Sequence, residues 1–201
     1  MTDLTVLAIA ARAGDAELGM GMRLRWYADR GAAVHVHCLA GEPDADWRTA
    51  SVHLGLKDYT FSGVRPGFAG YRGLINAELF RVVPKLRPDV VYGVFPGDHE
   101  QDRRIAGDET EVVAMREVRD IRSFRCGPAD GFRPNLFFFG DDELMAARRT
   151  ALTALGRDAD EELARVAYRE HVHHRVIERM AAQDAFAEMF TVSRAIEGRR
   201  R

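Results

Sequence analysis

The run LTVLAIAA at Leu4–Ala11 decides the fold. It is continuously apolar and of strand length, as expected for a strand that is covered on both faces. A turn containing glycine follows, and then Glu17–Arg30, where large apolar residues recur every four positions as in a helix. The alternating run AAVHVHCL at Ala32–Leu39 predicts a second strand. Such a strand–helix–strand unit predicts a parallel sheet with right-handed crossovers.

The rest of the chain continues this alternation. Apolar periodicity predicts helices at Ala45–Leu56, Leu74–Leu86, Asp108–Arg122, Asp141–Leu155 and Asp158–Ala182. Strands are expected to start at Thr60–Phe61 and to span Asp89–Phe95 and Leu136–Phe139, with loops at Gly63–Gly73 and Pro96–Asp102. We therefore expect a single α/β domain over residues 1–201, Rossmann-like, with a mostly parallel sheet and helices on both faces.

Charge and composition exclude several classes of protein. The 29 basic and 31 acidic residues nearly cancel, so no general field attracts nucleic acid or an anionic membrane surface. Leu4–Ala11 is too short for a signal peptide, and no apolar run is long enough to span a membrane. Two cysteines, Cys38 and Cys126, are too few for a disulfide scaffold. These features predict a cytoplasmic protein.

Two loops are the natural place for a functional site. In an open parallel sheet, ligands bind outside the carboxyl ends of the strands. The loop after Ala11 and the loop after Phe95 both occupy that position, and both are rich in charged residues.

The first of these loops carries a family resemblance. Ala10–Gly21, AARAGDAELGMG, resembles the first motif of the PIG-L/LmbE-like de-N-acetylase family, A-H-P-D-D-x-E-L-G-x-G-G, and is most similar to the bacillithiol-type deacetylase subset. Further similar segments follow in the family's order: Gly41-Glu42, Arg48, His53-Leu54-Gly55-Leu56, Arg87-Pro88-Asp89-Val90-Val91 and Ala187-Glu188-Met189-Phe190-Thr191-Val192. The resemblance spans nearly the whole chain and implies the LmbE-like α/β fold.

In that family the first motif supplies a zinc-binding His, a general-base Asp and a zinc-binding Asp. The resemblance places Arg12, Gly14 and Asp15 at these positions, so only the last is retained. A later H-x-D-H motif supplies an intermediate-stabilising His and another zinc-binding His. There the resemblance places Glu100 and Arg103, while the Asp between them is kept as Asp102. The stretch between Glu42 and Arg48 is also shortened, and Ser51 stands where the family has Glu.

These departures argue against zinc-dependent deacetylation. Arginine stays protonated and offers no lone pair to a metal. Losing the general base alone costs roughly 10²–10⁴ in rate. We therefore expect no metal and no cofactor, although the family's own activity is metal-dependent C–N hydrolysis. Whether the chain is an enzyme stays open.

Arg12 and Arg103 are expected to form a cluster with Asp15 and Asp102 in the former zinc position. In one interpretation the cluster only fills the space and holds the loops together. In another, a guanidinium stays free to bind a carboxylate, a phosphate or a developing oxyanion. In a third, a metal site is rebuilt from oxygen ligands and one imidazole, drawn from Asp15, Glu17, Asp98, His99, Glu100 and Asp102.

Our first hypothesis is a repurposed, zinc-independent enzyme or binder of a polar amide, amine or amino-sugar-like molecule in specialised metabolism. The catalytic candidates are His99, Asp15 and Asp102, and the substrate-binding candidates are Arg12, Arg103, Arg48 and Glu100. His99 is assigned acid–base work because histidine is the side chain suited to proton transfer near neutral pH. The alternative is a non-catalytic pseudoenzyme that serves as a partner or scaffold. A residual deacetylase with a rebuilt metal site is the third hypothesis.

The other histidines are interpreted as structural. His171, His173 and His174 are expected on a solvated helix face. His35 and His37 share one strand face and are expected to be structural or rim residues of the sheet. The expected partner is a polar small molecule, without nucleic acid or membrane. Assembly into a homo-oligomer is an open alternative.

Overall fold

The computed structural model describes residues 4–41, 46–67, 71–163 and 186–196. Its elements are β1 (Thr5–Ala10), α1 (Asp15–Asp29), β2 (Ala33–Ala40), α2 (Trp47–Leu54), β3 (Asp58–Val64), α3 (Arg72–Leu86), β4 (Val90–Val94), α4 (Gln101–Glu117), β5 (Asp120–Phe124), β6 (Leu136–Gly140), α5 (Asp142–Ala154) and β7 (Phe186–Ala195). The strand order is β3-β2-β1-β4-β5-β7-β6. Strands β1 to β5 pair in parallel, whereas β7 pairs antiparallel with both β5 and β6.

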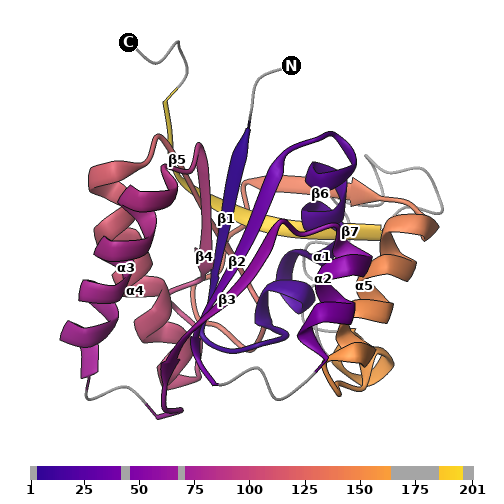
Figure 1. Cartoon of the computed structure of the whole chain (residues 1–201), viewed down its shortest axis with the longest axis horizontal. Coiled ribbons are helices and arrows are strands. Elements are labelled where there is room, and N and C mark those ends of the chain that lie inside the picture. Colours follow the sequence, from indigo (N-terminus) through magenta and orange to yellow (C-terminus); the bar gives the residue numbers. More distant parts are fainter. Residues whose placement is uncertain (1–3, 42–45, 68–70, 164–185, 197–201) are drawn as a thin grey trace.

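The sheet is covered by helices on both faces. Helices α1, α2 and α5 lie on one side of it, and α3 and α4 lie on the other (Figure 1). Alternate residues of β1 face the two layers: Val6 and Ala8 belong to the core beneath α1, and Leu7 and Ile9 to the core beneath α3 and α4. Both cores are closed to water, which explains why β1 is continuously apolar. The predicted α/β fold with a mostly parallel sheet is confirmed.

Strand β5 was not predicted, and the helix expected at Asp108–Arg122 is wrong after Glu117. Helix α4 begins at Gln101, inside the expected loop, and ends at Glu117, after which Asp120–Phe124 is extended. Pairing with β4 and β7 on either side overrides the local pattern. Asp120 and Arg122 lie on the same face of the strand and form an ion pair at 2.6 Å.

Strand β7 was also not predicted as a strand, because only its resemblance to a family segment was recognised. It lies between β5 and the edge strand β6 (Figure 1). The helix expected at Asp158–Ala182 lies mostly outside the described residues, as do His171, His173 and His174; residues 159–163 are helical. Within the described part of the chain, none of the helices is long and apolar enough to cross a membrane.

Helix α1 is broken where the sequence predicted a continuous helix. Met20 has non-helical angles (φ −152°, ψ 24°), which interrupts the backbone hydrogen bonds on either side. Glu188 of β7 accepts bonds of 2.8 Å from the backbone N–H groups of Met22 and Arg23. It therefore caps the second half of the helix as an N-terminal carboxylate does.

Arg148 of α5 satisfies the other side of the break. Its guanidinium donates to the carbonyl oxygens of Glu17 and Leu18, the last turn of the first half. A side chain at Gly21 would meet the aliphatic part of Arg148 at 2.7 Å, so this position requires glycine. Burial raises the pKa of Glu188 to about 7, while Arg148 and the two backbone bonds oppose the shift.

Candidate functional site

The two predicted loops meet at the carboxyl edge of the sheet. Asp15, the first residue of α1, is fully buried, and Arg103 in the first turn of α4 is nearly so. The guanidinium donates to Oδ1 of Asp15 through Nη2 at 2.6 Å and through Nε at 3.1 Å. Asp15 also accepts a 3.2 Å bond from the backbone N–H of Arg12, which orders the loop after β1. The expected pairing of Asp15 with Arg103 is present.

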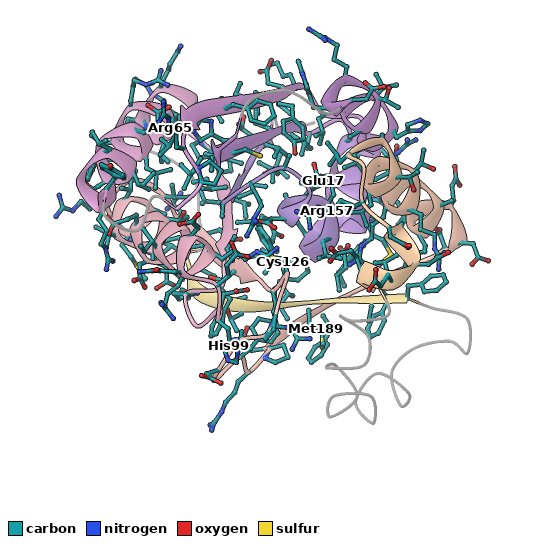
Figure 2. All side chains as sticks on the ribbon, turned by 90° about the horizontal axis from the view of Figure 1, so that it is seen from below. Glu17, Arg65, His99, Cys126, Arg157 and Met189 are labelled. Carbon is teal, nitrogen blue, oxygen red and sulfur yellow. The ribbon has the colours of Figure 1, made fainter. Side chains whose placement is uncertain are left out.

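A second guanidinium reaches the same carboxylate from a part of the chain that sequence analysis did not consider. Arg157, just after α5, donates to the carbonyl oxygen of Ala13 at 2.8 Å and lies 3.6 Å from Oδ1 of Asp15. Figure 2, which views the carboxyl edge, shows Arg157 beside Glu17 at the start of α1. The bond to Ala13 joins residues 144 positions apart, so no local sequence signal could have identified it.

Arg157 occupies the space that a side chain at residue 14 would need. Gly14 has φ +90°, a left-handed conformation that favours glycine. A Cβ atom built there would collide with the guanidinium of Arg157. The position that the resemblance assigns to the general base is therefore filled by a cation from elsewhere in the chain.

Glu100 forms the outer layer of the cluster. Its carboxylate pairs with Arg12 through one oxygen and lies 3.3 Å from Nη1 of Arg103 through the other. The side chains of Arg12 and Glu100 are 45% and 34% exposed, whereas that of Arg103 is 11% exposed. Arg12 is thus the cation of this cluster that water, or a ligand, can reach.

Asp98 is an acid of the cluster whose hydrogen bonding is incomplete. Its Oδ1 accepts a 2.9 Å bond from the backbone N–H of Glu100, but Oδ2 is buried and has no partner among the described residues. Burial raises the pKa of Asp98 to about 6; Arg103 opposes the shift and Asp15 adds to it. Gly127 lies against it, because a Cβ there would be 3.0 Å from Oδ2.

Three predicted site residues lie elsewhere. Asp102 was expected to pair with the arginines, and that expectation is wrong: it accepts a 2.6 Å bond from the backbone N–H of Gly67 and so anchors the loop before α3. His99 is half exposed, at 2.9 Å from Asp130, near the rim of the molecule in Figure 2. Arg48 lies over the ring of Trp47, 4.7 Å from its centre. The roles suggested for His99 and Arg48 stay predictions.

Glu17 is buried beneath the cluster. Its Oε2 accepts a 3.0 Å bond from the backbone N–H of Gly14, and burial raises its pKa. Cys38 donates to the Tyr59 hydroxyl at 3.6 Å next to it. Burial also raises the pKa of Cys38 and Cys126 well above the ordinary thiol value, so neither is an activated nucleophile.

The residues at the position that the resemblance assigns to the metal do not fit zinc. Arg103 directs its donors at Asp15, the one retained ligand, and a second guanidinium approaches the same oxygen. A dication beside two fixed cations would be repelled, and neither guanidinium has a lone pair to offer. Within the described residues, no three His, Cys, Asp or Glu side chains are grouped so as to hold a metal ion.

No protein-family model matches the sequence, and no curated protein matches it. Solved structures do share its fold. A 4-carboxy-2-hydroxymuconate hydratase from Pseudomonas putida has a TM-score of 0.73 at 17% identity, covering 98% of this chain and 99% of that one. A conserved protein from Thermus thermophilus has a TM-score of 0.72 at 20% identity, covering 98% and 97%.

An N,N'-diacetylchitobiose deacetylase from Pyrococcus horikoshii has a TM-score of 0.68 at 15% identity, covering 94% of this chain and 83% of that one. Deacetylases of teicoplanin biosynthesis are also similar at 13–15% identity. These likenesses agree with the resemblance seen in the first motif. The chain therefore has the fold of the LmbE/PIG-L-type deacetylases.

Proposed function

We propose that this protein is a zinc-independent binder of a polar small molecule at the carboxyl edge of its sheet. The observation that carries the proposal is the 2.6 Å bond from Arg103 to the buried Asp15, which puts a guanidinium where the resemblance expects a metal. The fixed positive charge of Arg103, backed by Arg157, takes over the neutralisation of Asp15. In this proposal the protein serves specialised metabolism, and it acts without a zinc-bound water.

The ligand meets Arg12 first. This guanidinium is half exposed and pairs with a partly exposed Glu100, so a ligand anion can replace Glu100 at small cost. An arginine fork suits a planar carboxylate or the oxygen of a polarised amide. Among the solved neighbours, one is named for an acetylated amino sugar and one for a carboxylated small molecule. We infer a polar amide, amine or amino-sugar-like ligand that carries an acceptor or anionic group.

A non-catalytic scaffold is the second candidate, and a specific observation favours it. Asp15 is closed off by Arg103, Arg157 and the backbone N–H of Arg12, so the inner part of the cluster is satisfied without any ligand. His99, the residue chosen for acid–base work, is directed to Asp130 instead. In this candidate the Arg12–Glu100 pair is only a surface contact.

Binding of two probes separates the candidates. N-acetylmuramic acid is N-acetylglucosamine with an added lactyl ether group that carries a carboxylate, and we expect NMR titration to show that it binds more tightly. Arg12→Gln should remove most of that preference, whereas Arg149→Gln, at an exposed ion pair distant in sequence, should not. If neither probe binds saturably, or the preference survives Arg12→Gln, the scaffold candidate is favoured.

Restoring the family's residues tests the zinc argument. Elemental analysis of the purified protein should find no stoichiometric zinc, whereas Arg12→His with Arg103→His should gain affinity for it. Recovery of hydrolysis needs Gly14→Asp as well, and the structure adds a requirement: Arg157→Ala, because Arg157 fills the space of that side chain. Stoichiometric zinc in the unmodified protein, retained after mild chelation, would contradict the proposal.

A further inference from the structure

A cavity of about 400 Å³ lies on the other face of the sheet, between the last turns of α3 and strands β2 and β3. Its apolar wall includes Leu7, Val82 and Leu86, and its polar groups include His35, Thr60 and Lys85. None of its lining residues belongs to the cluster around Asp15. A volume in this range, apolar with a few fixed polar groups, is typical of small-molecule sites.

The parallel register of β2 and β3 builds the polar floor of the cavity. It places His35 opposite Asp58 and His37 opposite Thr60, on the same face of the sheet. Both ring nitrogens of His37 are engaged, by Thr60 and by Ser62 at 2.8 Å each. His37 is therefore a satisfied structural residue, as the sequence predicted.

His35 differs from His37 in having one ring nitrogen to spare. Its Nδ1 lies 3.0 Å from Oδ2 of Asp58, a geometry in which the carboxylate accepts the Nδ1 proton. Burial lowers the pKa of His35, so the ring is neutral near pH 7 and Nε2 carries a lone pair. Nε2 has no hydrogen-bond partner among the described residues. The cavity thus contains an acceptor that a ligand hydroxyl can satisfy.

Lys85 supplies the charge at the mouth of the cavity. The other cation of the lining, Arg81, is held by Glu78 through bonds of 2.6 and 2.8 Å. Asp58 is held by His35. Lys85 is exposed on the last turn of α3, and within the described residues it has no ion-pair partner. The mouth therefore offers one free ammonium group next to an apolar interior.

We propose that this cavity binds a small hydroxylated carboxylic acid with an apolar body, such as an aromatic hydroxy acid. The carboxylate pairs with Lys85, the hydroxyl donates to Nε2 of His35, and the apolar body packs on Leu7, Val82 and Leu86. One lysine beside a neutral imidazole is too little charge for a multiply charged phosphate. A metal ion is not expected, because the described residues offer no group of three ligands there.

The test is an NMR titration of the full chain with 4-hydroxybenzoate, benzoate and 4-hydroxybenzamide, up to about 10 mM, where weak binding of such small ligands is still detected. We expect 4-hydroxybenzoate to bind most tightly, with shifts at the backbone amides of His35, Thr60 and Leu86. Lys85→Gln should weaken binding of 4-hydroxybenzoate about tenfold, as the loss of one charged hydrogen bond predicts. His35→Phe should remove the preference for 4-hydroxybenzoate over benzoate.

Arg149→Gln, at an exposed ion pair on the other face of the sheet, is the matched control and should leave the titration unchanged. Because Lys85 is exposed, Lys85→Gln keeps the test decisive even if His35→Phe does not fold. The proposal is overturned if none of the probes saturates, if Lys85→Gln binds as the unmodified protein does, or if the shifts gather around Arg12. The two sites share no residue, so such a result leaves the function proposed above untouched.

Discussion

Two buried arginine–carboxylate ion pairs lie along α1, and they have different structural roles. Arg103 and Asp15, at the start of the helix, bond mainly to each other, at 2.6 Å. Arg148 and Glu188, at the break in the helix, are 3.7 Å apart and bond mainly to backbone groups. The second pair replaces helix hydrogen bonds that Met20 interrupts, whereas the first neutralises charges at a site. We therefore expect the fold to depend more on the pair at the break than on the pair at the site.

The largest expected effect is at the break in α1. Glu188→Ala leaves the N–H groups of Met22 and Arg23 without an acceptor and Arg148 without its carboxylate. These losses add up to about 5 kcal/mol of unfolding free energy, as much as many domains possess. We expect chemical denaturation to show a protein that is largely unfolded. Glu188→Gln keeps the shape of the side chain and one hydrogen-bond acceptor, so the free energy of unfolding should fall clearly less than in Glu188→Ala. Equal losses in the two variants would contradict a role for the hydrogen bonds.

The break in α1 could not be predicted from the local sequence. Apolar spacing at Leu18, Met22 and Trp26 continues across Met20, so it predicts one continuous helix. The interruption depends on Glu188 and Arg148, which lie more than 120 positions away. The apolar strands β1, β2 and β4 were predicted because burial on both faces leaves a local pattern. Strand β5 was missed because Asp120 and Arg122 interrupt its apolar pattern, and because it is pairing with β4 and β7 that makes this segment a strand.

Some contacts of the candidate site could be predicted from the sequence and others could not. The order of the loops and the pairing of Asp15 with Arg103 could be predicted, because the carboxyl ends of neighbouring parallel strands meet. The position of Arg157 could not, since only the tertiary fold brings the end of α5 to Gly14. Asp102 was misplaced because its loop is continued directly by α4, which turns the side chain to Gly67.

A smaller effect is expected at the site. Arg103→Met leaves Asp15 buried with Arg157 as its remaining cation, at 3.6 Å. We expect a loss of about 3 kcal/mol in thermal or chemical denaturation, at the low end for a broken buried pair. Arg103→Lys should cost less stability, because lysine keeps the positive charge although it cannot form both hydrogen bonds of the guanidinium. Arg149→Met, at an exposed pair, is the control and should cost under about 1 kcal/mol. A loss at Arg103 as small as the control would show that the pair holds nothing together.

The smallest effect is a dependence of stability on pH, which reports whether Asp98 is protonated in the folded protein. Asp98 has a pKa of about 6 in the folded protein against 3.8 as its ordinary value, so the folded state holds its proton more tightly than the unfolded chain. Its contribution to stability is complete only below its ordinary pKa of 3.8 and is lost as the pH rises through 6. Between pH 4 and pH 8 the loss is about 2 kcal/mol. Asp98→Asn should remove this part of the pH dependence and leave the part due to Glu188, whose pKa is about 7. Melting curves from pH 4 to pH 8 measure both. An unchanged profile in Asp98→Asn would mean that Arg103 keeps Asp98 ionised, and that the site is held by two carboxylates rather than one.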